Sequence, residues 1–157
     1  MFELQSMSVA APAAGANWSV TVTANDEWNL RSAICTLTTS ATVATRSLVL
    51  QVLDRASDVV MELPVGGTLA ASSASDFCWV SLAGSTTTGN NAAGQVGYGV
   101  LPDGWFPPGW SVRVSTNNLQ TGDQYSAIYL VYRVKPTPLL QYEGQLTLPD
   151  LMSLLAD

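Results

Sequence analysis

The stretch Trp110-Ser111-Val112-Arg113-Val114-Ser115 alternates apolar and polar side chains at every step. Successive side chains of a β-strand point to opposite faces, so this spacing predicts a strand with one buried side and one side facing solvent. The same pattern, or a short apolar run bounded by turn residues, recurs in seven other segments. They are residues 19–23, 28–39, 46–54, 57–63, 76–83, 95–101 and 125–134.

These segments are short and are separated by residues that favour turns, and no helix of ordinary length interrupts them. Asp54 to Ser57, for example, has the composition of a hairpin turn. The segment 84–94 is rich in Gly, Ser and Thr and is expected to be a solvent loop. The pattern predicts an all-β fold, an antiparallel β-sandwich of jelly-roll-like type, with an immunoglobulin-like sandwich as the alternative.

Both ends of the chain differ in composition from the body, which we expect to span residues 19–134. Residues 1–18 mix Ala, Ser, Pro and Gly and are expected to form an extended N-terminal arm. Pro136 and Pro138 should end the last strand, because proline cannot donate to a strand ladder. Residues 135–157 are therefore expected to form a C-terminal arm.

The C-terminal arm carries the signature of a short amphipathic helix. Thr147 followed by Asp150 is typical of a helix N-terminus. One apolar face follows at helical spacing and consists of Leu148, Leu151, Met152 and Leu155. A helix of about ten residues is not stable alone in water, so this face must dock on its own sandwich or on a neighbouring subunit.

Charge is scarce in this chain of 157 residues. Charged residues make up 11% of it, there is no histidine, and Lys135 is the sole lysine; soluble domains usually carry about 25% charged residues. No apolar run approaches the roughly 20 residues of a membrane-spanning helix, and the first residues lack the pattern of a secretory signal. A surface so poor in charge is expected where other subunits cover it.

The net charge of −6 argues against nucleic acid or an anionic membrane as a partner. The absence of histidine removes the usual base of Ser or Cys nucleophiles and makes a zinc site on two cysteines improbable. Two carboxylate pairs, Asp54 with Asp58 and Asp26 with Glu27, lie beside predicted turns, where such residues are common. We therefore expect neither an enzyme nor a bound cofactor or metal.

The two cysteines, Cys35 and Cys78, lie in apolar strand segments. Free cysteine packs as a small hydrophobic residue, so the first interpretation is two buried free thiols. A disulfide is the alternative, although nothing in the sequence indicates an oxidising compartment.

Three aromatic residues, Trp105, Phe106 and Trp110, crowd a corner rich in proline and glycine at residues 102–109. They could close one end of the sandwich, form a platform for a sugar ring, or contact another subunit. Together with the apolar residues of the C-terminal arm they are the candidate interface. That candidate set is Leu139, Leu140, Leu148, Leu151, Met152, Leu155, Trp105, Phe106 and Trp110.

Several short motifs follow one another along the body of the chain. They are Glu27-Trp28-Asn29-Leu30-Arg31-Ser32, then Thr36-Leu37-Thr38-Thr39-Ser40-Ala41-Thr42-Val43-Ala44-Thr45-Arg46, and later residues 101–102, 109–113 and 119–128. These motifs resemble a module found in structural proteins of tailed phages. The motifs follow one another in the same order as in those phage proteins and cover roughly Trp28 to Val134. The resemblance implies a small β-sandwich component of the virion, similar to the cement or decoration proteins of capsids.

The resemblance also implies roles for particular residues and partners. Trp28, Arg46 and Asp123 occupy positions of the shared motifs, and Arg46 is expected to pair with a carboxylate such as Asp54 or Asp123. The implied partners are the major capsid protein and further copies of the chain in a homotrimer. The protein would be made in the host cytoplasm and bind the outer capsid surface, bridging capsomers. The alternative is a receptor-binding or glycan-binding module of a tail fibre or baseplate, with the aromatic corner on its surface.

Overall fold

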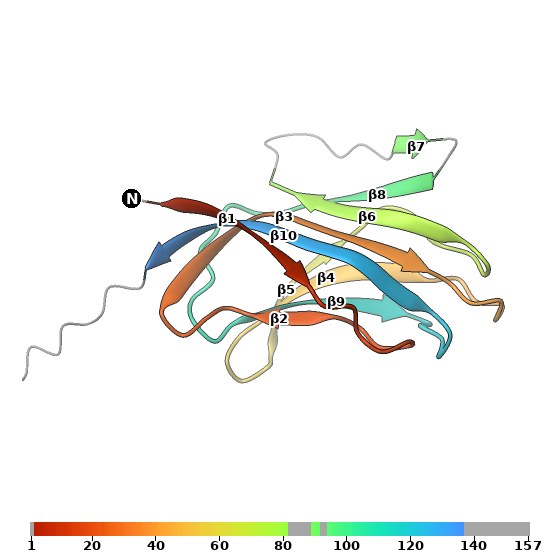
Figure 1. The fold of residues 1–157 in the computed structure, drawn as a ribbon, viewed down its shortest axis with the longest axis horizontal. Coiled ribbons are helices and arrows are strands. Elements are labelled where there is room, and N and C mark those ends of the chain that lie inside the picture. Colours follow the sequence, from red (N-terminus) through yellow and green to blue (C-terminus); the bar gives the residue numbers. More distant parts are fainter. Residues whose placement is uncertain (1, 82–88, 92–93, 137–157) are drawn as a thin grey trace, which may run out of the picture.

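The fold consists of two β-sheets that lie one above the other (Figure 1). The computed structural model describes residues 2–81, 89–91 and 94–136, and within these residues there is no helix. The larger sheet has six strands in the order β1-β10-β3-β6-β8-β7. Its strands are β1 (Glu3–Val9), β3 (Asp26–Thr38), β6 (Ala74–Val80), β7 (Gly89–Asn91), β8 (Gly94–Val100) and β10 (Gln124–Pro136).

The smaller sheet has four strands in the order β2-β9-β4-β5. They are β2 (Ser19–Thr21), β4 (Ser47–Leu53), β5 (Val59–Pro64) and β9 (Ser111–Asn117). The alternation predicted for residues 110–115 is confirmed in β9, where Val112 and Val114 are fully buried and Ser111, Arg113 and Ser115 are partly exposed. The turn expected at 54–57 connects β4 to β5, and the Asp54 carboxylate accepts the N–H groups of Ala56 and Asp58 at 2.8 and 3.0 Å.

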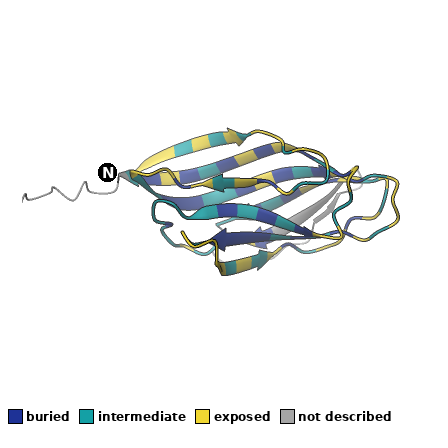
Figure 2. Ribbon diagram, turned by 90° about the horizontal axis from the view of Figure 1, so that it is seen from below, coloured by how far each residue is buried: buried dark blue, intermediate teal, exposed yellow. Residues whose placement is uncertain are grey.

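One hydrophobic core lies between the sheets, and both sheets contribute to it. Buried and exposed residues alternate along the strands (Figure 2). Trp28 and Trp79 enter the core from the larger sheet, Leu50 and Val114 enter it from the smaller one, and Trp18 enters it from the segment before β2. The expected all-β architecture with two sheets is confirmed. The jelly-roll assignment stays a prediction, and the C-terminal helix lies outside the described residues.

The expected N-terminal arm is wrong for most of residues 1–18. β1 is a regular edge strand of the larger sheet, antiparallel to β10 from Glu3 opposite Val134 to Val9 opposite Ile128. Met7 and Val9 pack against the core, but Glu3 and Gln5 occupy the earlier positions of the same alternation, so the apolar pattern in the sequence is too short to indicate a strand. Trp18 was expected at the end of the arm. It is instead one of the largest side chains of the core and is only 1% exposed.

Two further expectations about the larger sheet are corrected. Strands β6 and β8 run parallel, whereas every pair was expected to be antiparallel. The segment 84–94, expected to be a loop throughout, contains β7, which pairs antiparallel with β8. Strand pairing uses main-chain groups, so the low apolar content of this segment did not prevent a strand from forming.

Candidate functional site

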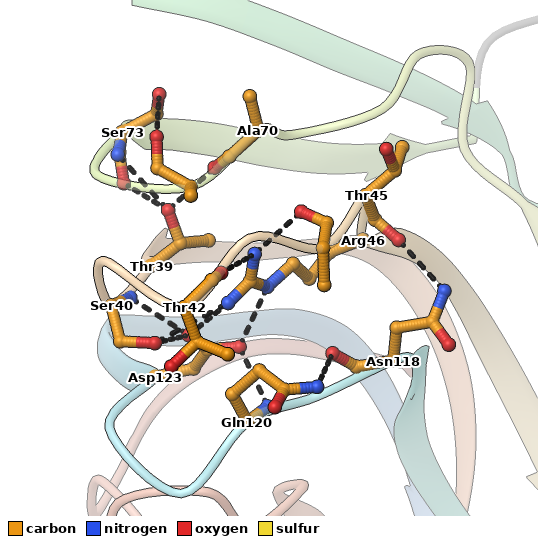
Figure 3. A network of polar contacts seen from close by, with 12 residues as sticks. Thr39, Ser40, Thr42, Thr45, Arg46, Ala70, Ser73, Asn118, Gln120 and Asp123 are labelled. Atoms are coloured by element: carbon orange, nitrogen blue, oxygen red, sulfur yellow. Dashed lines mark hydrogen bonds and ion pairs between the residues drawn. The ribbon is translucent and has the colours of Figure 1, made fainter.

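A fully buried ion pair joins two of the motif residues, Arg46 and Asp123 (Figure 3). The Arg46 Nε and Nη2 groups donate to the two carboxylate oxygens of Asp123, each at 2.9 Å. Arg46 Nη1 donates to the carbonyl oxygens of Thr42 and Ala44. The sequence left Asp54 and Asp123 open as partners, and the structure selects Asp123.

Asp123 is also held by main-chain donors. The N–H groups of Ser40 and Gln120 donate to its carboxylate, each at 2.8 Å, and the Ser40 hydroxyl adds a third donor. Burial alone would raise the pKa of Asp123, but Arg46 and these N–H groups hold that pKa well below its ordinary value. Every oxygen of the carboxylate is thus engaged, and the pair connects the loop after β3 to the loop before β10. Its geometry is that of a structural clamp.

Trp28, the third motif residue, is also structural. Its ring stacks on Tyr132 with centroids 4.2 Å apart, and it is buried in the core. Its main chain forms a two-way bridge with Phe106, in which Trp28 N–H donates at 3.0 Å and Phe106 N–H donates at 2.7 Å.

The aromatic corner does not present its three side chains on one surface. Phe106 is buried and stacks on Trp110, whose ring centroid lies 6.4 Å away. Trp105 is partly exposed and lies against Phe2 at 5.0 Å, with the Lys135 ammonium 5.4 Å from its ring centroid. Phe106 therefore helps to close the end of the sandwich, as one of the three alternatives predicted. The three rings do not form a common platform for a sugar in this geometry.

Both cysteines are free thiols. Cys35 is buried, and desolvation raises its pKa to about 12. Cys78 is only partly buried, which corrects the expectation of two buried thiols, and burial raises its pKa as well. The two side chains point to opposite faces of the sheet, because Cys78 lies opposite Ile34 rather than Cys35 in the β3–β6 register.

The most unusual surface among the described residues is the outer side of the larger sheet. Two adjacent cross-strand rows at its centre contain no charged side chain, and we call them the six-strand face. They are Ser8, Tyr129, Ile34 and Cys78 in one row and Ser6, Val131, Ser32, Val80 and Val100 in the other. Tyr129 is 51% exposed, Val100 is 39% exposed and Ile34 is 36% exposed.

The six-strand face is bounded by charge at both ends. Arg133 of β10 lies in the row beyond Val131, and Asp76 of β6 lies in the row on the other side of Cys78. An exposed apolar patch with a polar rim is characteristic of a surface that meets another protein.

The outer side of the smaller sheet is different, because its side chains satisfy one another. Arg113 Nε donates to Gln51 at 2.8 Å, and Gln51 Nε2 donates to Glu62 at 2.6 Å, so one polar chain crosses three strands. Sheet faces that bond internally in this way have little to gain from an apolar partner.

A groove lies along β9 on this polar side. Most of its lining is polar, and the lining residues are Asn17, Trp18, Ser19, Leu53, Ser57, Ser111, Arg113 and Ser115. Within the described residues no carboxylate lies within 4.0 Å of the Arg113 guanidinium, in a chain whose net charge is −6. The groove therefore offers a cation and several hydroxyl groups to a ligand.

No protein family, curated protein or solved structure matches this chain. In the part of the chain that the structure describes, no group of three or more Cys, Asp or Glu residues could hold a metal ion. That part also contains no helix long and apolar enough to cross a membrane.

The candidate residues of the C-terminal arm, from Leu139 to Leu155, lie outside the described residues. The six-strand face was not among the sequence candidates. Its signal was present in the alternation of β10, where Tyr129 and Val131 are apolar on the side opposite Ile128 and Leu130. Apolar residues on both sides of a strand usually indicate a strand covered on both faces, so this signal by itself does not identify an exposed surface.

Proposed function

We propose that this chain is a structural component of a phage virion, a cement or decoration protein that binds the outer capsid surface and bridges capsomers. Its partners would be the major capsid protein and further copies of itself, in the homotrimer that the resemblance implies. It would act through contact area alone, without making or breaking covalent bonds.

The observation that carries this proposal is the six-strand face. It is uncharged and partly apolar, whereas the other sheet face carries a hydrogen-bonded polar network. Covering Tyr129, Ile34 and Val100 with a protein partner would remove apolar surface from water without desolvating an unpaired charge. The scarcity of charge in the whole chain fits the same use.

The test is cosedimentation of the purified chain with capsids that were assembled without it. We expect the wild-type chain to pellet with the capsids. Ile34→Lys or Tyr129→Lys should weaken binding about tenfold or more, because each places a charge in the contact. Tyr129 is 51% exposed and Ile34 is 36% exposed, so the stability of the free chain should change by about 1 kcal/mol or less.

Thr21→Lys is the matched control, since Thr21 is exposed on the outer side of the smaller sheet. It should bind capsids as the wild-type chain does. A wild-type chain that stays in the supernatant, or face variants that pellet normally, would remove the proposal.

The groove along β9 favours a second candidate, a receptor-binding or glycan-binding module. A sugar acid would present a carboxylate to Arg113 and hydroxyl groups to the surrounding serines. Galacturonate should then bind in a calorimetric titration, while galactose should not. Arg113→Gln should abolish the binding and Arg133→Gln should retain it. Absence of heat at millimolar galacturonate would exclude this candidate.

A further inference from the structure

The four edges of the two sheets are protected to very different degrees. β2 and β7 are edge strands of three residues each. β5 is longer, but it carries Glu62, ends in Pro64 and pairs with β4 through a register irregularity. β1 is the fourth edge, and it runs for seven residues in an uninterrupted register with β10.

An edge strand exposes unpaired N–H and C=O groups that can template another strand. Proteins usually protect such edges with short strands, proline, lysine, inward charges or bulges. Residues 4–9 of β1 have none of these features, and Glu3 is the single charge of the strand. No described residue pairs with the outer edge of β1.

We propose that β1 pairs with β1 of a second copy, antiparallel, about a two-fold axis through Ser6. Centring on Ser6 uses the whole strand, and the register then follows from the sequence. Gln5 would lie opposite Met7, Leu4 opposite Ser8 and Glu3 opposite Val9. No like charges meet, so the strand is complementary to itself, which is the requirement for a two-fold interface.

The pairing joins two six-stranded sheets into one. A two-fold axis perpendicular to the sheet keeps both outer faces on the same side, so the two six-strand faces become one continuous surface. On the inner side, Met7 and Val9 are only partly buried at the open edge and gain cover from the second copy. The pairing names a second copy of the chain as the partner at β1. Its role in the virion rests on the proposed function. If the chain also forms trimers, β1 pairing between them gives an assembly with an even number of chains, because every copy pairs with one other.

The test uses Ser6→Cys and Ser8→Cys in the full chain with Cys78→Ser, so that the remaining native thiol, Cys35, is buried. Ser6 and Ser8 are both exposed and on the same side of β1. In the proposed register the two copies of residue 6 are directly opposite, about 4.5–5.5 Å apart between Cα atoms, which suits a disulfide. The two copies of residue 8 are offset by about 13 Å along the strands.

With oxidised glutathione, Ser6→Cys should form disulfide-linked dimers at least about tenfold faster than Ser8→Cys, as read from a non-reducing gel. Equal rates for the two variants would overturn the pairing, and so would a wild-type chain that sediments as a monomer at 100 µM (about 10⁻⁴ M). These failures are separable from failure of the proposed function. A chain that pellets with capsids and is sensitive to Ile34→Lys, yet shows no Ser6→Cys dimer, retains the capsid role and loses only the β1 pairing.

Discussion

Asp123 joins two loops through its carboxylate. It neutralises a fully buried arginine and also accepts hydrogen bonds from Ser40 and Gln120. Buried pairs contribute little compared with an apolar pair of the same shape, but removing one partner leaves an uncompensated charge in the interior. The stability of the folded chain therefore depends strongly on both Arg46 and Asp123.

Asp123→Asn should lower the free energy of unfolding by about 3–5 kcal/mol, because Arg46 would stay buried without a carboxylate. Urea denaturation followed by tryptophan fluorescence measures this change. Asp58→Asn, at an exposed turn position, should cost about 0.5 kcal/mol or less and is the matched control. Equal costs for the two variants would contradict the assignment of Asp123 as a clamp.

The same pair gives the stability of the chain a defined dependence on pH. The pKa of Asp123 is lowered in the folded chain relative to about 3.9 in the unfolded chain, so the unfolded chain binds its proton first. The stabilisation is therefore complete above that unfolded value and is lost as the pH falls toward the folded value. The difference in free energy of unfolding between the wild-type chain and Asp123→Asn should shrink from pH 5 to pH 2. A difference that stays constant over this range would show that Asp123 does not titrate as described.

Among the strands, the parallel pair of β6 and β8 depends on one glycine. Trp79 of β6 is buried beside Gly99 of β8, and its indole N–H donates to the Leu63 carbonyl of the other sheet at 2.9 Å. A Cβ atom at Gly99 would lie 2.2 Å from the Trp79 ring. The absence of a side chain at Gly99 therefore leaves room for the Trp79 ring, which reaches across the core to the other sheet.

Gly99→Ala should destabilise the chain by about 1–3 kcal/mol, because the added methyl group displaces Trp79 from its site. Thermal denaturation with near-ultraviolet circular dichroism reports both the stability and the environment of the ring. At Gly104 a Cβ would meet nothing within 4 Å, so Gly104→Ala is the control and should leave both unchanged. A Gly99→Ala variant with wild-type stability would show that Trp79 can move at no cost.

The whole molecule has one core shared by two sheets, so neither sheet buries its apolar side without the other. Trp18, Trp28 and Trp79 reach this core from three separate parts of the chain. The β1–β10 and β3–β10 pairings join residues about a hundred positions apart in sequence, which is typical of slowly folding β-proteins.

Unfolding should therefore be a single cooperative transition, because separating the sheets exposes the shared core at once. Tryptophan fluorescence and far-ultraviolet circular dichroism should give coincident urea transitions, measured at a concentration low enough to avoid association. Two separated transitions would show that one sheet persists without the other.

The sequence predicted most of the strands of this fold, but it did not predict the six-strand face. Alternation in segments such as 111–115 and 125–134 predicted strands correctly, because a strand with one buried side has apolar residues at every second position. β1 and β7 were missed, since β1 has only two apolar residues on its inner side and the sequence of β7, Gly89-Asn90-Asn91, contains no apolar side chain. The Arg46–Asp123 pair was one of two options, because a contact across 77 positions leaves no local signature.

The sequence by itself determined that the body of the chain, as far as the structure describes it, is all-β, that Val112 and Val114 face inward, and that the chain carries little charge, because period and composition are local properties. Tertiary structure alone decided which strands are neighbours. It placed β1 at an open edge, ran β8 parallel to β6, and aligned Tyr129 with Ile34 and Cys78 into an uncharged face. Strand order and register depend on how distant segments share one core, and no single segment contains that information.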